Sequence, residues 1–197
     1  MNIQKQLITL LFITVSSIAL AQETKNQIQA DFTNYLNSIV NMELEKSLDY
    51  MPTEFFDIIP KAKMLEVMKQ TFNNPDMEID IKNPTILKID DAQKIENKYY
   101  SLLTYSSQMD MKINGEEHET EEDKKLRISM TKTAFQQSFG AENVVYNDTT
   151  GFFEIQSQKD VYGISDNGKT GWKFLVLEKN QKVILEKLLP AQLIQDL

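Results

Sequence analysis

Side chains that could carry out chemistry are scarce in this chain. It holds one histidine, His118, and no cysteine. A Ser-His-Asp triad or a histidine general base would have to use His118, which stands in an acidic run that we expect to be solvated, whereas a catalytic group needs a positioned, partly buried site. Without cysteine, thiol nucleophiles and the usual zinc ligands are missing too. We therefore predict no catalytic residue, no metal site and no cofactor.

Carboxylates leave one kind of catalysis open, because a carboxylate in an apolar pocket can act as a general base. Asp110 and Asp49 are the candidates. Asp110 falls on the polar side of its predicted strand, opposite Met109 and Met111, and we expect that side to be wet, so Asp110 could act only if it lined a cavity. A small-molecule enzyme with a buried carboxylate base is thus the alternative to a domain without chemistry.

The N-terminus has the features of a secretory signal. Lys5 precedes an apolar stretch from Leu7 to Leu20, and Ala19-Leu20-Ala21 supplies small residues for cleavage. The stretch is shorter than the roughly 20 apolar residues of a membrane-spanning helix. We expect residues 1–21 to be a cleavable signal peptide and residues 22–197 to form a single α+β domain that is secreted or periplasmic, with no membrane insertion after cleavage.

The charge balance limits the partners. The chain has 29 acidic and 21 basic residues, for a net charge of −8, and no basic block. Because nonspecific nucleic-acid affinity comes from Lys and Arg that neutralise phosphates, the composition argues against nucleic acid and against an anionic membrane surface. A small molecule or an envelope protein partner fits better, and a homodimer stays open.

Four stretches repeat apolar residues at spacings of three and four, which predicts amphipathic helices. They cover residues 25–41, 44–51, 60–72 and 120–139. Thr120 is the predicted N-cap of the last helix. Its predicted buried stripe consists of Leu126, Met130, Ala134, Phe135 and Phe139.

Elsewhere apolar and polar residues alternate, which predicts strands with one buried face. The first strand begins at Met77 and ends at Ile89, with Leu87 on its buried face, and the second covers Leu103 to Ile113. Shorter strand signals form a meander at residues 144–146, 152–156, 161–164, 172–177 and 183–185. Helices followed by antiparallel strands predict an α+β fold, with N-terminal helices packed on a curved antiparallel sheet and one inserted helix near 120–139.

Two segments carry a resemblance to a known family. Asn41 to Met51, followed by Phe55 to Ile59 and Pro60-Lys61, resembles the opening of nuclear transport factor 2-like domains of exported bacterial proteins. The Asp166-Asn167-Gly168 turn that leads to Trp172-Lys173-Phe174-Leu175 is similar to the closing strands of that group. The resemblance extends over residues 25–188. It implies a cone-shaped, cystatin-like sheet closed by helices, often with a pocket between them, and no particular activity.

Four aromatic residues would surround the pocket that the resemblance implies. They are Tyr35, Tyr105, Trp172 and Phe174. In a pocket they would offer apolar walls with a few hydrogen bonds, and they are the predicted ligand-binding residues. The same side chains could fill an ordinary core, which is the more common role because aromatic residues dominate ordinary cores. We therefore predict an exported, non-enzymatic domain that binds a small, partly apolar ligand or an envelope protein partner.

Overall fold

The computed structural model describes the backbone of residues 3–195 and the side chains of residues 21–178 and 180–195. The helices are α1 (Ile3–Val40), α2 (Leu44–Leu48), α3 (Phe55–Ile58), α4 (Lys61–Phe72), α5 (Glu121–Phe139) and α6 (Lys182–Leu188). The strands are β1 (Met77–Ile89), β2 (Gln93–Ile95), β3 (Lys98–Ile113), β4 (Val144–Asn147), β5 (Phe152–Ser165) and β6 (Lys173–Val176).

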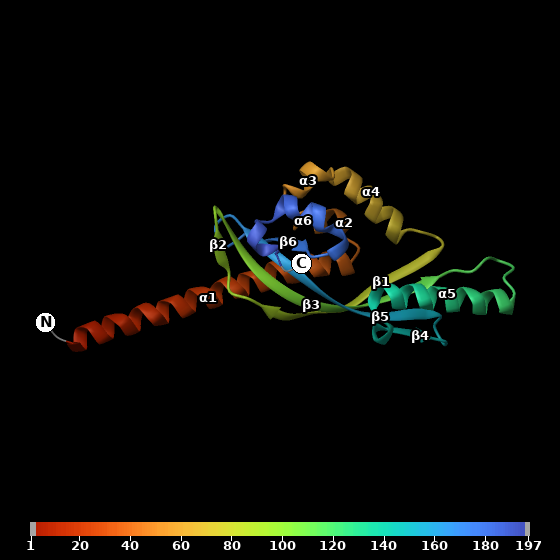
Figure 1. Cartoon of the computed structure of the whole chain (residues 1–197), viewed down its shortest axis with the longest axis horizontal. Helices are drawn as coiled ribbons and strands as arrows, with labels where there is room; N and C mark the ends of the chain where they lie inside the picture. Colours follow the sequence, from red (N-terminus) through yellow and green to blue (C-terminus); the bar gives the residue numbers. More distant parts are fainter. Residues whose placement is uncertain (1–2, 196–197) are drawn as a thin grey trace.

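An open, curved antiparallel sheet forms the centre of the molecule (Figure 1). Its strand order is β1-β3-β5-β4, while β2 pairs with β3 and β6 pairs with β5. Strands β3 and β5 keep one register from Tyr99 opposite Ser165 to Met111 opposite Phe153, so they form the frame to which the other strands attach. The α+β prediction is confirmed, including the inserted helix near 120–139, which is α5.

Helices cover both faces of the sheet, because successive residues of the long strands point to opposite sides. Helix α1 packs Ile28 and Phe32 against the face that carries Leu103 and Val161, here called the α1 face. Helices α3 and α6 pack against the opposite α6 face. The buried residues of that second cluster are Phe55, Ile95, Tyr100, Tyr162, Ile164, Leu175, Leu185 and Leu189.

Helix α5 covers the far end of the α1 face, and of the stripe predicted for it only Phe135 and Phe139 pack there. Phe135 meets Phe153 edge to face at a centroid distance of 5.2 Å, and Ile128 packs in the same cluster. Leu126 and Met130 are instead 59% and 64% exposed. The prediction that Leu126, Met130 and Ala134 are buried is wrong, because the side of α5 that packs on the sheet carries Ile128 together with the two aromatic rings.

Two further predictions are corrected by local geometry. The stretch 183–185 is not a strand but part of α6, because Leu185 and Leu189 recur at helical spacing on the sheet while Val183 is 69% exposed. In β1 the register shifts between Lys82 and Thr85 and again between Ile86 and Lys88. These bulges turn Leu87 outward, where it is 53% exposed, and Ile86 inward.

The N-terminal prediction concerns residues whose side chains, up to residue 20, lie outside the described part of the chain. The expected cleavage point after Ala21 falls within α1. Among the described residues, no helix combines the length and the apolar character needed to cross a bilayer. Export therefore stays a prediction.

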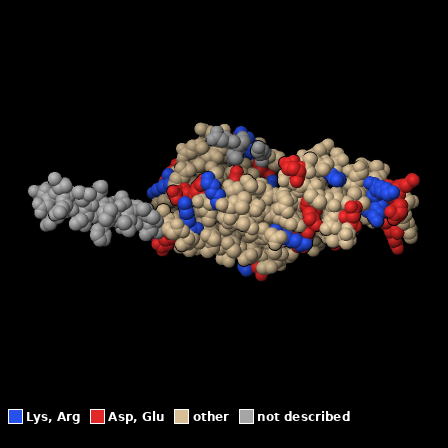
Figure 2. All heavy atoms as spheres, turned by 90° about the horizontal axis from the view of Figure 1, so that it is seen from below, with Lys and Arg blue, Asp and Glu red and all other residues tan. Residues whose placement is uncertain are grey.

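Figure 2 shows acidic and basic side chains interspersed on the visible face, with a dense group at the end of the molecule where α5 begins. Arg127 organises that end: its Nε and Nη2 donate to the two carboxylate oxygens of Glu119, both at 2.7 Å, and its Nη1 donates to the carbonyl of Ile113 at 2.6 Å. The acidic loop is thereby fixed to strand β3. The predicted cap is present too, because Thr120 Oγ1 accepts from the Asp123 backbone N–H.

Candidate functional site

The four predicted ligand-binding residues lie in one apolar cluster on the α1 face. The Phe174 ring stands 4.8 Å from the Phe32 ring and 6.0 Å from the Tyr35 ring, and Tyr105 meets Phe32 edge to face at 5.3 Å. Trp172 and Phe174 are each 1% exposed. The Trp172 indole N–H is buried without a hydrogen-bond partner among the described residues.

None of these four residues lines any of five hollows on the described surface. The burial of Trp172 and Phe174 and the ring contacts around Phe32 give the cluster the packing of a core. Burial raises the pKa of Tyr105 to about 12, with a further contribution from Glu178. Burial also raises the pKa of Tyr35, and the neighbouring Tyr105 adds to it. Both phenols therefore stay protonated at neutral pH. Ligand binding by these four residues stays a prediction.

A different feature is an interruption in the pairing of β5. On one side, β5 pairs with β3 along its whole middle. On the other side, β4 covers residues 152–155 and β6 covers residues 161–164, and the Leu177 N–H donates to the Asp160 carbonyl at 2.9 Å. Residues 156–159 have no partner strand on that side in the described sheet. We call this stretch the β5 gap.

In an antiparallel ladder, the N–H and C=O groups of successive residues point alternately to the two neighbouring strands. This alternation tells which groups of the β5 gap point away from β3. The carbonyl of Asp160 points toward β6. The N–H and C=O groups of Gln158 and Gln156, two and four residues earlier, point to the same side. Those of Ser157 and Lys159 point to β3, where they face Ser107 and Tyr105. Gln156 and Gln158 thus present main-chain N–H and C=O groups without a partner strand in the middle of β5.

Two adjoining hollows follow the β5 gap, with volumes of about 440 and 350 Å³. They share Ser138, Gln158 and Lys159, so together they form one surface groove, which we call the gap groove. The first hollow continues to α6 and the second to the end of α5. The other lining residues are Ser106, Phe139, Asn143, Gln156, Ser157, Asp160, Leu177, Glu178, Asn180, Lys182 and Leu185.

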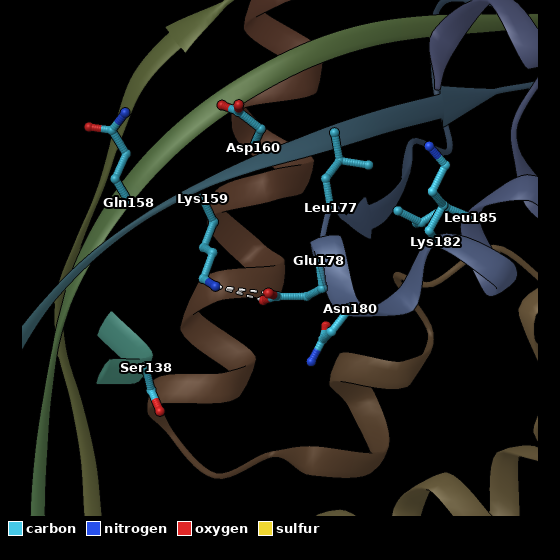
Figure 3. Close-up of a pocket in the computed structure, with 9 residues that line it drawn as sticks. All are labelled: Ser138, Gln158, Lys159, Asp160, Leu177, Glu178, Asn180, Lys182 and Leu185. Carbon is cyan, nitrogen blue, oxygen red and sulfur yellow. Dashed lines mark hydrogen bonds and ion pairs between the residues drawn. The ribbon is translucent and has the colours of Figure 1, made fainter. Parts of the chain in front are cut away.

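An ion pair stands on the α1-face side of the gap groove. Lys159 Nζ lies 2.9 Å from Glu178, and both side chains are about one third exposed. Figure 3 shows these two side chains turned toward each other, while Gln158 and Asp160 point to the other side of β5. Tyr105 faces Lys159 across the β3–β5 pair. The ion pair therefore separates the groove from the aromatic cluster.

The two candidate general bases have different surroundings. Asp110 is 7% exposed, so the expectation that this side of β3 is wet is wrong at this residue. Lys82 Nζ donates to one of its carboxylate oxygens at 2.7 Å and Gln108 Nε2 to the other at 2.6 Å. Asp110 lines none of the five hollows. With both oxygens occupied by donors, Asp110 is arranged as a structural ion pair.

Asp49 is a poorer candidate on electrostatic grounds. Its side chain is 64% exposed and accepts a hydrogen bond from Lys61 Nζ at 2.6 Å. That hydrogen bond lowers the pKa of Asp49, which makes the carboxylate a weaker base. His118 is exposed on the loop before α5, in an acidic hollow that also contains Arg127. Within the described residues, no three metal-ligating side chains gather in a way that could hold an ion.

Comparisons of the chain with protein-family models, with curated proteins and with solved structures found no match. The fold and the gap groove therefore have to be interpreted from their own geometry.

Sequence reasoning missed the gap groove. It predicted two strands, 152–156 and 161–164, with an interruption at Ser157-Gln158-Lys159-Asp160. The structure has one continuous strand there. The polar stretch marks the place where the neighbouring strand is missing, and this was the one signal in the sequence that could have located the site.

Proposed function

We propose that this protein is a non-enzymatic binding domain and that the gap groove is its binding site. The observation that carries the proposal is that two adjoining hollows coincide with the unpaired stretch of β5. Unpaired main-chain groups on a strand are binding groups that already have a fixed orientation.

The lining of the groove supports a ligand that is partly apolar and carries hydrogen-bonding groups. Leu177 and Leu185 offer apolar contacts. Ser138, Gln158 and Asn180 offer hydroxyl and amide groups, which can both donate and accept. The charged pair Lys159 and Glu178 is mutually neutralised, which favours a ligand of low net charge.

The remaining parts of the hypothesis are proposals as well. The predicted signal peptide would bring the domain to the periplasm or the medium, where the partner would be a small molecule or an envelope protein. The resemblance to nuclear transport factor 2-like domains agrees with helices packed on a curved sheet, and it too remains part of the proposal. No arrangement described above favours the alternative of a carboxylate enzyme.

The test is native mass spectrometry of the mature protein purified from the envelope fraction of its own host. We expect a bound small molecule or peptide on the wild type. The variant Ser138→Trp fills the part of the groove that both hollows share and should lose the bound species. Ser129→Trp, on an exposed position of the same helix outside the groove, is the matched control and should keep it. A species that stays on Ser138→Trp, or no species on the wild type, would count against the groove.

A further inference from the structure

We propose that the occupant of the gap groove is an extended polypeptide segment that adds to the sheet between β6 and β4. This inference rests on the proposed function, because it names the chemical class that the same groove takes. It is carried by the arrangement of three strands, β4, β5 and β6, and not by any one side chain.

Strands β6 and β4 lie end to end along the same side of β5, and both run antiparallel to it. Val176 is opposite Val161 and Val144 is opposite Ile155. A segment inserted between them in the same direction would complete one row of strand from β6 to β4. The flanking strands thus fix both the direction and the plane of the occupant.

The β5 gap also fixes the length of the occupant. It comprises residues 156–159, because Asp160 is already bonded to Leu177. At about 3.3 Å per residue, four residues span roughly 13 Å. We therefore expect an extended segment of about four residues. Its ends must turn away from the sheet, because Leu177 after β6 and Asn143 before β4 occupy the positions on either side of the gap.

Main-chain complementarity favours a polypeptide over another small ligand. Gln158 and Gln156 each present one N–H and one C=O at the repeat of a strand, and an antiparallel peptide supplies the complementary acceptors and donors at the same repeat. Alternate side chains of the peptide would then point to the two sheet faces. One set would lie near Lys159 and Glu178, and the other near Gln158 and Leu185.

The outer edge of β1 does not offer the same opportunity. Two register shifts bend β1, Asn83 has a positive φ of 52°, and Pro84 cannot donate a hydrogen bond. Bulges, proline and charged side chains are the devices by which edge strands avoid pairing with other chains. The middle of β5 carries none of these devices among its four residues apart from Lys159, whose charge is paired with Glu178.

The inference can be tested on the full chain with a pool of fluorescently labelled hexapeptides, capped at both ends, and a second pool N-methylated at every residue, so that no peptide N–H can donate to β5. Binding is followed by fluorescence anisotropy and located by the backbone amide NMR shifts of Gln156 and Gln158. Two variants separate main-chain from side-chain recognition. Gln158→Pro removes the N–H that points into the gap while leaving the β3 ladder intact, and Gln158→Ala keeps this N–H.

We expect peptides selected from the first pool to bind the wild type and Gln158→Ala within about threefold of each other, since the N–H is kept in both. Gln158→Pro and N-methylated copies of the same peptides should bind at least about tenfold more weakly, because each lacks main-chain donors. Peptides that bind equally well after N-methylation would overturn the inference.

The groove itself can be tested separately from the peptide. If no peptide binds but a co-purified small molecule shifts the Gln156 and Gln158 amides, the peptide inference fails and the binding groove stands. If neither kind of ligand shifts these amides, both fail. The amide spectrum of Gln158→Pro shows whether this variant is folded. If it is not, the comparison between plain and N-methylated peptides alone tests the inference.

Discussion

Gly168 lies directly against the ring of Tyr99, so closely that a Cβ on this glycine would stand 2.6 Å from the ring Cδ1. The glycine also has a φ of +69°, which side chains rarely tolerate. Its turn is tied down by Ser165, whose Oγ accepts from the Gly168 N–H at 3.1 Å. The turn that leads to β6 can therefore approach strand β3 this closely only because residue 168 has no side chain.

This contact gives the first prediction. Gly168→Ala combines a left-handed backbone with a clash against an aromatic ring, so we expect it to lower the free energy of unfolding by about 2–4 kcal/mol. Gly171 has nearly the same φ, +67°, but nothing within 4 Å of its Cβ position. Gly171→Ala should therefore cost only about 1–2 kcal/mol. Equal losses in urea unfolding would show that the ring contact is unimportant.

The second prediction concerns the centre of the aromatic cluster. Phe32 is fully buried and touches the rings of Tyr35, Tyr105 and Phe174. Phe32→Ala should cost about 3–5 kcal/mol because it leaves a cavity beneath α1. Val183→Ala, at an exposed site on α6, should change stability by less than about 0.5 kcal/mol. If Phe32→Ala lowers the free energy of unfolding no more than the control does, α1 is not firmly packed on the sheet.

The third prediction compares an ion pair whose carboxylate is buried, Lys82 with Asp110, with a pair whose carboxylate is exposed, Lys112 with Glu78. Lys82→Met deprives the buried Asp110 carboxylate of its cation, and we expect a clear loss of stability in urea unfolding, larger than that of the exposed control pair. Lys112→Met removes the partner of Glu78, whose side chain is 51% exposed, and should cost less than about 1 kcal/mol. In the double variant Lys82→Met/Asp110→Asn, part of the first loss should be recovered. A double variant no better than Lys82→Met alone would contradict a role for the buried charge.

The fourth prediction is a dependence of stability on pH. The hydrogen bonds from Arg127 lower the pKa of Glu119 below its ordinary value of 4.5. A carboxylate with a depressed folded-state pKa stabilises the fold above its unfolded pKa and loses that contribution as the pH falls through the folded pKa. Glu119→Gln should therefore reduce the melting temperature at pH 7, and the difference from wild type should shrink below about pH 4.5. A constant difference from pH 7 to pH 3 would argue against the ion pair.

The sequence allowed the fold class to be predicted because the long periodic stretches are unambiguous. The stripe from Ile28 to Leu36 has helical spacing, and Met77 to Ile81 alternates as a strand. The errors occurred where two patterns compete within a short span. In α5, Leu126 and Ile128 begin two rival apolar stripes, and only the position of Phe153 on another strand decides between them.

The gap groove, our proposed site, was harder to predict for a physical reason. A strand's own sequence does not say whether a neighbour covers all of its length, since this depends on where β4 begins and where β6 ends. The polar stretch from Ser157 to Asp160 was visible, but it was left outside the two predicted strands 152–156 and 161–164. Of the predicted ligand-binding residues, Tyr35, Tyr105 and Phe174 surround Phe32, which contacts their rings, and ligand binding by them stays a prediction.

The interruption of pairing along β5 has a consequence for how this strand behaves in deuterated water. The main-chain amides of Glu154, Gln156, Gln158 and Tyr162 all point to the same side, yet β4 protects the first and β6 protects the last. Local protection follows the hydrogen bond that each amide makes. One strand should therefore show slow, fast and again slow deuterium uptake along its length, so that its kinetic profile resembles that of two short strands joined by a loop.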